Sequence, residues 1–340
     1  MHSQKEEFAM TSTSPRFGVM LVNLGTPDAP TTPAVRRYLR EFLSDKRVVD
    51  LPRWKWWPIL NGFVLTTRPQ RVAKAYASIW TDEGSPLLVI ARRQQAALRE
   101  RLREQYGEEI PVALAMDYGN PTMESAGLEL RDAGVSNVLV IPMYPQFSSS
   151  TTASVFDRLA RALKKCPAHP GLRFVRSYCD HPMYIEALSN SVNEHWEKEG
   201  QRGHLVMSFH GIPERYARQG DPYPRECQAT SEALAQALGL TENEWTMTYQ
   251  SRFGREEWLK PYTDKKLMEW GKDKTHRAID IMSPAFSADC LETLEELEEE
   301  NRENFMDAGG ERYTYIPALN DRPDHIEVFV ALVEENTKGW

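Results

Sequence analysis

The sequence lacks an apolar run of about 20 residues, the length that a membrane-spanning helix needs. Residues 1–15 are polar and contain no apolar segment of the kind that a secretory signal requires. Basic charge is also scarce, because the 340 residues carry a net charge of −8 and have a pI near 5.6. Binding to nucleic acid usually needs a basic face that displaces counterions from phosphates, so we exclude a nucleic-acid partner. We expect a cytoplasmic protein whose residues 1–15 are disordered.

Cysteine is sparse, and its spacing gives no sign of a metal site. Cys166, Cys179, Cys227 and Cys290 lie far apart and form no C-x-x-C pair. A zinc site or an iron–sulfur cluster therefore has no local signature. The simplest interpretation is that these cysteines are reduced thiols that pack as small apolar side chains.

The chain does contain a series of short apolar runs, each ending near Gly or Pro and followed by helical periodicity. This alternation predicts parallel α/β units. The runs are residues 18–23, 112–116, 138–143, 205–209, 246–250 and 278–282.

The second half of the chain repeats turn motifs of the first half. The paired motifs are LGTP (24–27) with HGIP (210–213), YG (118–119) with FG (253–254), and PQFS (145–148) with PAFS (284–287). Chance similarity is an alternative, since such turns share Gly and Pro for conformational reasons. We interpret the pattern as two similar doubly wound domains, the first of which carries an insertion. Ligands of such folds bind beyond the carboxyl ends of the parallel strands.

This interpretation gives a domain organisation. We expect a first domain over residues 16–165 with an insertion near 51–65, and a second domain over residues 166–320. We expect residues 321–340 to form a helix that packs back on the first domain.

The two halves differ where titratable residues occur. Leu24 stands where His210 stands in the second half, and the same correspondence places Ala153 opposite Glu292. A cleft between the domains would have an apolar wall facing a polar, proton-accepting wall. Such a cleft suits a flat apolar ligand with a reactive centre.

His210 ends an apolar run and precedes Gly-x-Pro, so we expect it at the ligand-binding edge of a sheet. An imidazole titrates near neutral pH and can accept a proton or bind a metal. A lone histidine is more often a structural residue, and position alone does not separate the two roles.

Residues 287–301 have the pattern of a helix that begins near Ser287, a suitable N-cap. Glu292, Glu296 and Glu300 recur every fourth residue and would form a row of carboxylates on one helix face. A solvated acidic face is the ordinary explanation of such a row. The sharper hypothesis is a row of oxygen ligands that leads to the imidazole, since Fe²⁺ accepts both donor types.

The insertion contains Trp54, Trp56 and Trp57, which alternate with Arg53 and Lys55. A dense aromatic cluster can belong to a core. It can equally form an amphipathic lip that receives an apolar ligand and touches a membrane interface.

At these motifs the sequence resembles the ferrochelatase family, specifically its bacterial type. The resemblance extends from Phe17 to Val333. It is carried by LVNLGTP (21–27), GSPL (84–87), YPQFS (144–148), SFHGIP (208–213), YQSRFG (249–254) and DCLETLEE (289–296).

The resemblance implies two Rossmann-like domains with parallel sheets, the chelatase-like arrangement, and a porphyrin cleft between them. It implies a lyase that inserts Fe²⁺ into protoporphyrin IX to form heme, the last step of heme biosynthesis. Because the sequence resembles the proteobacterial type, we expect protoporphyrin IX rather than coproporphyrin III as the substrate. His210 and Glu292 fall on the family's catalytic and metal-binding pair. From the acidic row itself we hypothesise that Glu296 and Glu300 relay protons or metal ions. The porphyrin-binding candidates are Leu24, Tyr118, Trp54, Trp56 and Trp57.

Some family members hold an iron–sulfur cluster through an internal cysteine and three cysteines in a carboxyl-terminal extension. Here the internal position is Ser149, and no cysteine follows Cys290. We therefore expect no cluster and no other cofactor, since Fe²⁺ is a substrate. The extension that assists dimerisation in mitochondrial members is also missing, which favours a monomer. Contact with the inner face of the cell membrane through the Trp-rich insertion is a further expectation.

Three other functions are compatible with parts of the sequence. A cobalt chelatase of precorrin synthesis shares the fold but has a metal site richer in histidine. A protein that carries or senses heme could use the same cleft without turnover, but it would not need the acidic row. A nicotinamide-dependent dehydrogenase is disfavoured because the first strand turn lacks G-x-G-x-x-G.

Overall fold

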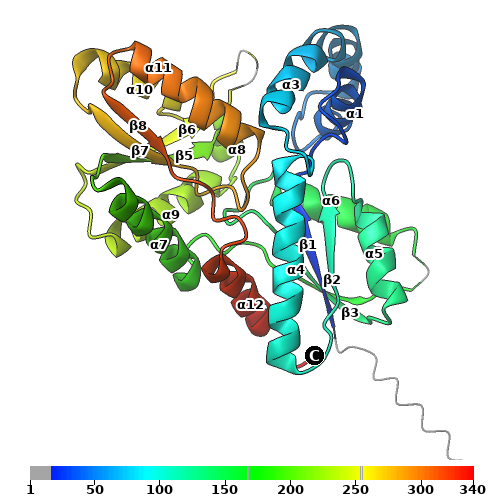
Figure 1. Cartoon of the computed structure of the whole chain (residues 1–340). Helices are drawn as coiled ribbons and strands as arrows, with labels where there is room; N and C mark the ends of the chain where they lie inside the picture. Colours follow the sequence, from blue (N-terminus) through cyan, green and yellow to red (C-terminus); the bar gives the residue numbers. More distant parts are fainter. Residues whose placement is uncertain (1–16, 167, 253, 255) are drawn as a thin grey trace, which may run out of the picture.

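Parallel strands form two separate four-stranded sheets in the computed structural model, which describes residues 17–166, 168–252, 254 and 256–340 (Figure 1). The first sheet has the order β2-β1-β3-β4 and the second has the order β6-β5-β7-β8. The strands are β1 (Gly18–Asn23), β2 (Val112–Met116), β3 (Asn137–Pro142), β4 (Gly171–Phe174), β5 (His204–His210), β6 (Trp245–Gln250), β7 (Ala278–Met282) and β8 (Arg312–Tyr315).

The two sheets have the same topology, which confirms the predicted pair of similar parallel α/β domains. In each sheet the first strand along the chain pairs with the second on one side and with the third on the other. The fourth strand then pairs with the third. Strand β4 of the first sheet lies beyond residue 165, where the sequence placed the end of the first domain.

Helices connect the strands and cover both faces of each sheet. The first half contains α1 (Thr32–Leu43), α2 (Arg53–Ile59), the π-helix η1 (Leu60–Val64), α3 (Leu65–Ile79), α4 (Pro86–Tyr106), α5 (Met123–Asp132) and α6 (Thr152–Leu163). The second half contains α7 (Pro182–Glu199), α8 (Glu214–Arg218), α9 (Tyr223–Ala237), α10 (Thr263–Asp273), the π-helix η2 (Glu292–Glu300), α11 (Asn301–Asp307) and α12 (Pro323–Thr337).

Strand alternation builds two apolar layers around the first sheet. Val19 and Leu21 of β1 pack in the cluster that includes α4 and α12, whereas Met20 and Val22 pack against α5 and α6. Successive side chains of a strand point to opposite faces, so a buried parallel strand is apolar at every position. In the second sheet, α7 and α9 cover one face, and α10, α11 and η2 cover the other.

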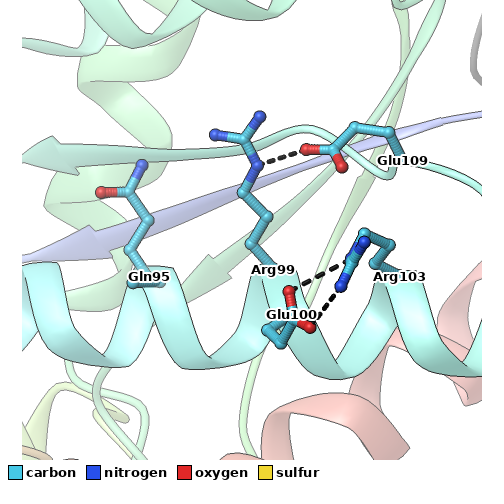
Figure 2. A pocket seen from close by; sticks show the side chains of 6 residues that line it. Gln95, Arg99, Glu100, Arg103 and Glu109 are labelled. Carbon is cyan, nitrogen blue, oxygen red and sulfur yellow. Dashed lines mark hydrogen bonds and ion pairs between the residues drawn. The ribbon is translucent and has the colours of Figure 1, made fainter.

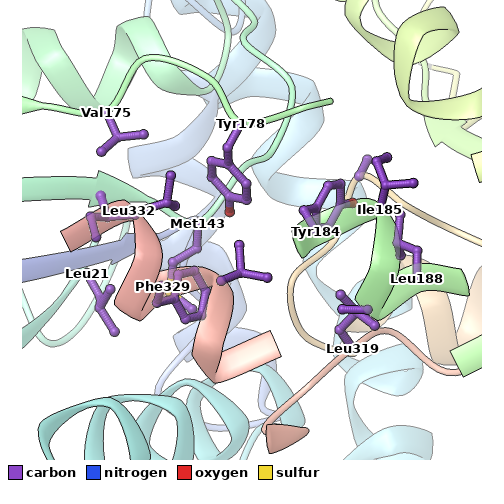
Figure 3. Packing of buried hydrophobic residues seen from close by; sticks show 14 of the residues in the cluster. Leu21, Met143, Val175, Tyr178, Tyr184, Ile185, Leu188, Leu319, Phe329 and Leu332 are labelled. Atoms are coloured by element: carbon purple, nitrogen blue, oxygen red, sulfur yellow. The ribbon is translucent and has the colours of Figure 1, made fainter. Parts of the chain in front are cut away.

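One continuous apolar cluster joins the two domains. Met143 and Phe329 on the first-domain side and Tyr184, Leu188 and Leu319 on the other side belong to this cluster (Figure 3). Helix α12 contacts α4 and α7, so the carboxyl-terminal helix packs against both halves (Figure 1). The two domains therefore share one apolar core.

The insertion of the first domain comprises α1, α2, η1 and α3, which lie between β1 and α4. It has its own small core, in which Trp56 packs with Leu43, Leu60, Val64 and Leu65. No helix in the described part of the chain is long and apolar enough to span a membrane.

The acidic helix begins later than the sequence predicted. Ser287 is not its N-cap, because the Ser287 hydroxyl donates to the carbonyl of Met143, and helical structure begins at Leu291. Asp289 fixes the preceding residues, since its carboxylate accepts from the hydroxyl of Tyr315 at 2.6 Å and from the amide of Asn320 at 2.7 Å. These tertiary hydrogen bonds hold residues 287–290 in a non-helical conformation where a local capping signal suggested a helix.

Candidate active site

His210 lies at the carboxyl end of β5, one of the two central strands of the second sheet. Its register partner is Gln250 at the end of β6, and the backbone N–H of Gly211 donates to the Gln250 carbonyl at 2.8 Å. The edge of the His210 ring faces Phe286, with ring centroids 6.5 Å apart. The strand thus presents the imidazole at the edge where ligands of α/β folds bind.

One hydrogen bond determines which His210 nitrogen can accept a proton. Nδ1 lies 2.7 Å from the carbonyl oxygen of Gly211. A carbonyl can only accept, so Nδ1 carries the hydrogen in the neutral ring. The lone pair of Nε2 is then left to accept a proton or to bind a metal.

Glu292 is the first residue of η2 and is half-buried. The amide Nε2 of Gln250 donates to the Glu292 carbonyl at 2.8 Å, which ties the start of η2 to the strand that neighbours His210. In a π-helix the hydrogen bonds span one residue more than in an α-helix, a rare geometry that is frequent at functional sites. The acidic row is therefore carried by a π-helix, whereas the sequence predicted regular helical spacing.

Glu296 lies inside the site. Its carboxylate accepts a hydrogen bond of 2.8 Å from the backbone N–H of Ser251 and another from the Ser251 hydroxyl. Burial raises the pKa of Glu296, and the negative charge of Glu292 adds to the rise. The hydrogen bonds from Ser251 and the charge of His210 oppose it. Glu296 is therefore close enough to both His210 and Glu292 to interact with them electrostatically.

Glu300 lies at the far, exposed end of η2. Between it and the site, burial raises the pKa of Glu295, and the charge of Glu300 raises it further. The acidic row consequently leads from solvent at Glu300 to the half-buried carboxylate of Glu296.

The first domain contributes two tyrosines that the sequence did not single out. Burial raises the pKa values of Tyr38 on α1 and Tyr76 on α3 well above the usual range, and the charge of Glu292 raises both further. Leu291 packs in the same cluster as Tyr76, so the start of η2 touches the insertion. Neither tyrosine lies in a strand-end motif, and the sequence carried no signal for them. Gln250 and Ser251 did lie in a recognised motif, YQSRFG.

Two candidates of the first domain lie at the ends of its strands. Leu24 follows β1 and is half-buried. Tyr118 follows β2 and is fully buried, with its hydroxyl 3.0 Å from Ser154 Oγ and 3.2 Å from an oxygen of Asp45, to which it donates. The guanidinium of Arg158 lies over the Tyr118 ring, 4.2 Å from its centroid. Tyr118 thus packs inside the first domain, beyond the end of β2.

Asp117 is a buried carboxylic acid beside Tyr118 that the sequence analysis missed. Its side chain is 1 % exposed, and one oxygen lies 3.1 Å from Nε of Arg158. Burial raises the pKa of Asp117 to about 7 against the opposing pull of Arg158. An aspartate after an apolar strand is a signal that could have indicated it.

The three tryptophans of the insertion have different surroundings. Trp54 is 75 % exposed and Trp57 is 47 % exposed, whereas Trp56 is 6 % exposed and donates from its indole N–H to the Leu43 carbonyl at 2.7 Å. Leu51, Ile59 and Phe63 are further exposed apolar residues of this segment. We call Leu51, Trp54, Trp57, Ile59 and Phe63 the lip. Trp56 holds the lip from inside.

A surface hollow of about 390 Å³ beside α4 is a poor alternative site. Its charged groups are already paired, Arg99 with Glu109 and Arg103 with Glu100 (Figure 2). Within the described residues, no three His, Cys, Asp or Glu side chains are arranged to hold a metal ion in advance.

The fold and the site together define the class of protein. The structure resembles the sirohydrochlorin chelatase SirB from Bacillus subtilis subspecies spizizenii, solved with cobalt, with a TM-score of 0.54 over 94 % of each chain. At 10 % identity this likeness shows a shared two-domain chelatase fold. Residues 16–337 match the ferrochelatase family model, and the chain belongs to the ferrochelatase family.

Curated relatives agree with this assignment. A ferrochelatase of Marinomonas sp. (strain MWYL1) is 57 % identical over 327 residues, which cover 95 % of this chain and 98 % of the relative. Ferrochelatase 1 of Shewanella oneidensis is 52 % identical, with coverage of 97 % and 99 %. The family resemblance inferred from the motifs is confirmed.

Proposed function

We propose that this protein is an enzyme of the lyase class that inserts Fe²⁺ into protoporphyrin IX, which gives protoheme and two protons. The family membership supports this function, and the observation that carries it is the site itself. Nε2 of His210 keeps its lone pair at the end of a parallel strand, and the half-buried carboxylate of Glu296 is close enough to interact with both His210 and Glu292.

The reaction requires two pyrrole N–H protons to leave as the metal bonds to the four nitrogens. We assign acceptance of these protons, one after the other, to Nε2 of His210, because Nδ1 already carries the hydrogen that it donates to the Gly211 carbonyl. His210 would pass the first proton on through the acidic row before it accepts the second. Glu292 would support the imidazolium that forms and contact the metal. Glu296 and Glu300 would pass cations or protons between solvent and the site, since the row runs from an exposed to a half-buried carboxylate.

The walls of the cleft would hold the macrocycle. Leu24, Tyr118, Trp54 and Trp57 remain porphyrin-binding candidates, and Trp56 would act from inside the lip. The binding energy of the macrocycle would hold the ring in a puckered form, in which the nitrogen lone pairs are exposed to the metal.

The proposed enzyme has no resident cofactor. The position that carries the internal cluster cysteine in some relatives is Ser149, whose hydroxyl donates to Asp221 at 2.6 Å. Among the described cysteines, Cys179, Cys227 and Cys290 are buried and Cys166 is exposed.

We also propose that the monomer touches the inner face of the cell membrane through the lip. Arg53 and Lys55 lie over the rings of Trp57 and Trp54, at 5.9 Å and 5.0 Å from the centroids. Tryptophan and basic residues together favour an anionic interface. Cosedimentation with phosphatidylglycerol vesicles should exceed that with phosphatidylcholine vesicles and should fall in Trp54→Ala/Trp57→Ala. Equal sedimentation with all vesicles would oppose the membrane proposal.

Anaerobic titration of the protein and protoporphyrin IX with Fe²⁺ tests the main proposal. Loss of porphyrin fluorescence and appearance of the heme spectrum at catalytic protein concentration are the expected result. Binding of porphyrin without turnover would favour a heme carrier. Faster insertion of Co²⁺ than Fe²⁺ would favour the cobalt chelatase.

A further inference from the structure

An ion pair crosses from the second domain to the base of the lip. Both terminal nitrogens of the Arg215 guanidinium donate to the two carboxylate oxygens of Asp50. Arg215 lies on α8, shortly after His210, and Asp50 lies just before α2 begins at Arg53. The pair therefore connects the segment that carries the imidazole to the segment that carries the exposed tryptophans.

A second contact runs parallel to this pair. The hydroxyl of Tyr216, the next residue of α8, donates to the Val48 carbonyl at 3.5 Å. The Tyr216 ring is buried. Residues 48–50, which precede the lip and which we call the lip base, thus contact α8 at two successive residues, Arg215 and Tyr216.

The same short segment is fastened to the first domain at its other end. Arg47 pairs with Asp157 of α6 at 2.8 Å, and the hydroxyl of Ser154 donates to Asp45 at 2.9 Å. Residues 45–50 therefore connect α6 of the first domain to α8 of the second.

Two further contacts hold the guanidinium of Arg215 in the orientation in which it meets Asp50. Its Nε donates to Glu256, and its plane lies 4.5 Å from the centroid of the Tyr216 ring. A planar fork held in this way suits two-point recognition of a carboxylate. The two side chains of the pair are 28 % and 39 % exposed, so water and salt can reach and weaken the interaction. The Arg215–Asp50 ion pair therefore has a specific geometry, but it can still break.

We propose that Arg215–Asp50 is a latch that holds the lip over the porphyrin cleft, with Arg215 as a positioning residue. The proposal rests on the proposed function, because it assigns a step to that reaction. When the pair is formed, the lip and the His210 segment are kept at a fixed separation around the macrocycle. When it breaks, the lip base is released on the second-domain side, and heme can leave.

The test measures heme dissociation by transfer to excess apomyoglobin and the KM for porphyrin. Arg215→Gln and Asp50→Asn should each speed dissociation by about threefold to tenfold, the range that a partly exposed two-point pair can supply. The KM for porphyrin should rise in parallel. The double variant should resemble either single variant, and added NaCl should speed release from the wild type more than from the variants.

Arg218→Gln is the matched control. Arg218 lies on the same helix and pairs with Glu214 of that helix, at 3.5 Å. Wild-type dissociation in Arg215→Gln and Asp50→Asn would overturn the latch, as would equal effects in Arg218→Gln or fully additive effects in the double variant. A wild type that releases heme in a salt-dependent way but inserts no metal would instead count against the proposed function.

Discussion

The backbone N–H of Ser251 donates a hydrogen bond of 2.8 Å to the carboxylate of Glu296, and the Ser251 hydroxyl donates to the second oxygen. Ser251 adopts a φ of 61°, in the left-handed region that is uncommon for residues other than glycine. The turn after β6 therefore directs the N–H and hydroxyl groups of Ser251 toward Glu296 on η2. Glu296 is held in one orientation, close to His210 and Glu292.

Glu296→Gln should lower the metallation rate by about tenfold or more, because a neutral amide cannot carry a proton or attract a cation. The same change should move the thermal midpoint little at neutral pH, because the amide removes a desolvated charge but leaves one of the two Ser251 donors without its acceptor oxygen. Burial raises the pKa of Glu296, so ionising this group costs the folded state more than the unfolded state. Turnover and thermal unfolding are to be measured on the same preparations.

Glu292→Gln should reduce turnover more than Glu296→Gln, since we place Glu292 at the metal. Glu300→Gln is the comparison at the exposed end of the row and should have the smallest effect on rate. Unchanged rates in both Glu296→Gln and Glu300→Gln would return these two residues to an ordinary acidic helix face.

Asp117 predicts a specific pH dependence of stability. Its folded pKa of about 7 lies above the unfolded value near 4, so the folded state binds more protons between these pH values. Its contribution to the free energy of unfolding should fall as pH rises through this window, by up to about 1.4 kcal/mol per pH unit, and level off above it. Asp117→Asn should remove this slope in urea unfolding. The exposed Asp28→Asn should retain it, and identical slopes for Asp117→Asn and the wild type would refute the assignment.

The insertion tryptophans should separate into two classes. Trp56→Ala should destabilise the protein by about 3–5 kcal/mol, because it empties a buried site and removes the hydrogen bond to Leu43. Trp54→Ala should leave stability nearly unchanged because its ring is exposed, while weakening porphyrin binding. Denaturant unfolding and fluorescence titration distinguish the two effects. Equal stability losses would contradict the assigned orientations.

The sequence predicted the architecture because strand periodicity and strand-end turns are local signals. His210 could be placed for the same reason, since it ends an apolar strand. The start of the acidic helix was placed too early because Ser287 and Asp289 are hydrogen-bonded to partners far along the chain, Met143 and Tyr315. The opposite orientations of Trp54 and Trp56 depend on packing within the insertion, which residue type alone does not encode.

Ser149 leads to a prediction about the isolated protein. Anaerobically purified protein should contain no stoichiometric iron and acid-labile sulfide, and its colour should come from porphyrin or heme alone. The Ser149 hydroxyl is hydrogen-bonded to Asp221 and offers no thiolate ligand. Iron and sulfide in equal amounts to protein would require another set of cluster ligands.

Metal insertion by His210→Ala is the most direct measurement of the account. The variant should fold and bind protoporphyrin IX, as judged by circular dichroism and fluorescence titration, yet it should insert neither Fe²⁺ nor Zn²⁺ at a measurable rate. His195→Ala, which changes a histidine on α7 that contacts Thr314 at 3.2 Å, serves as the control and should keep turnover. Near wild-type insertion by a folded, porphyrin-bound His210→Ala would contradict the assignment of proton acceptance to His210.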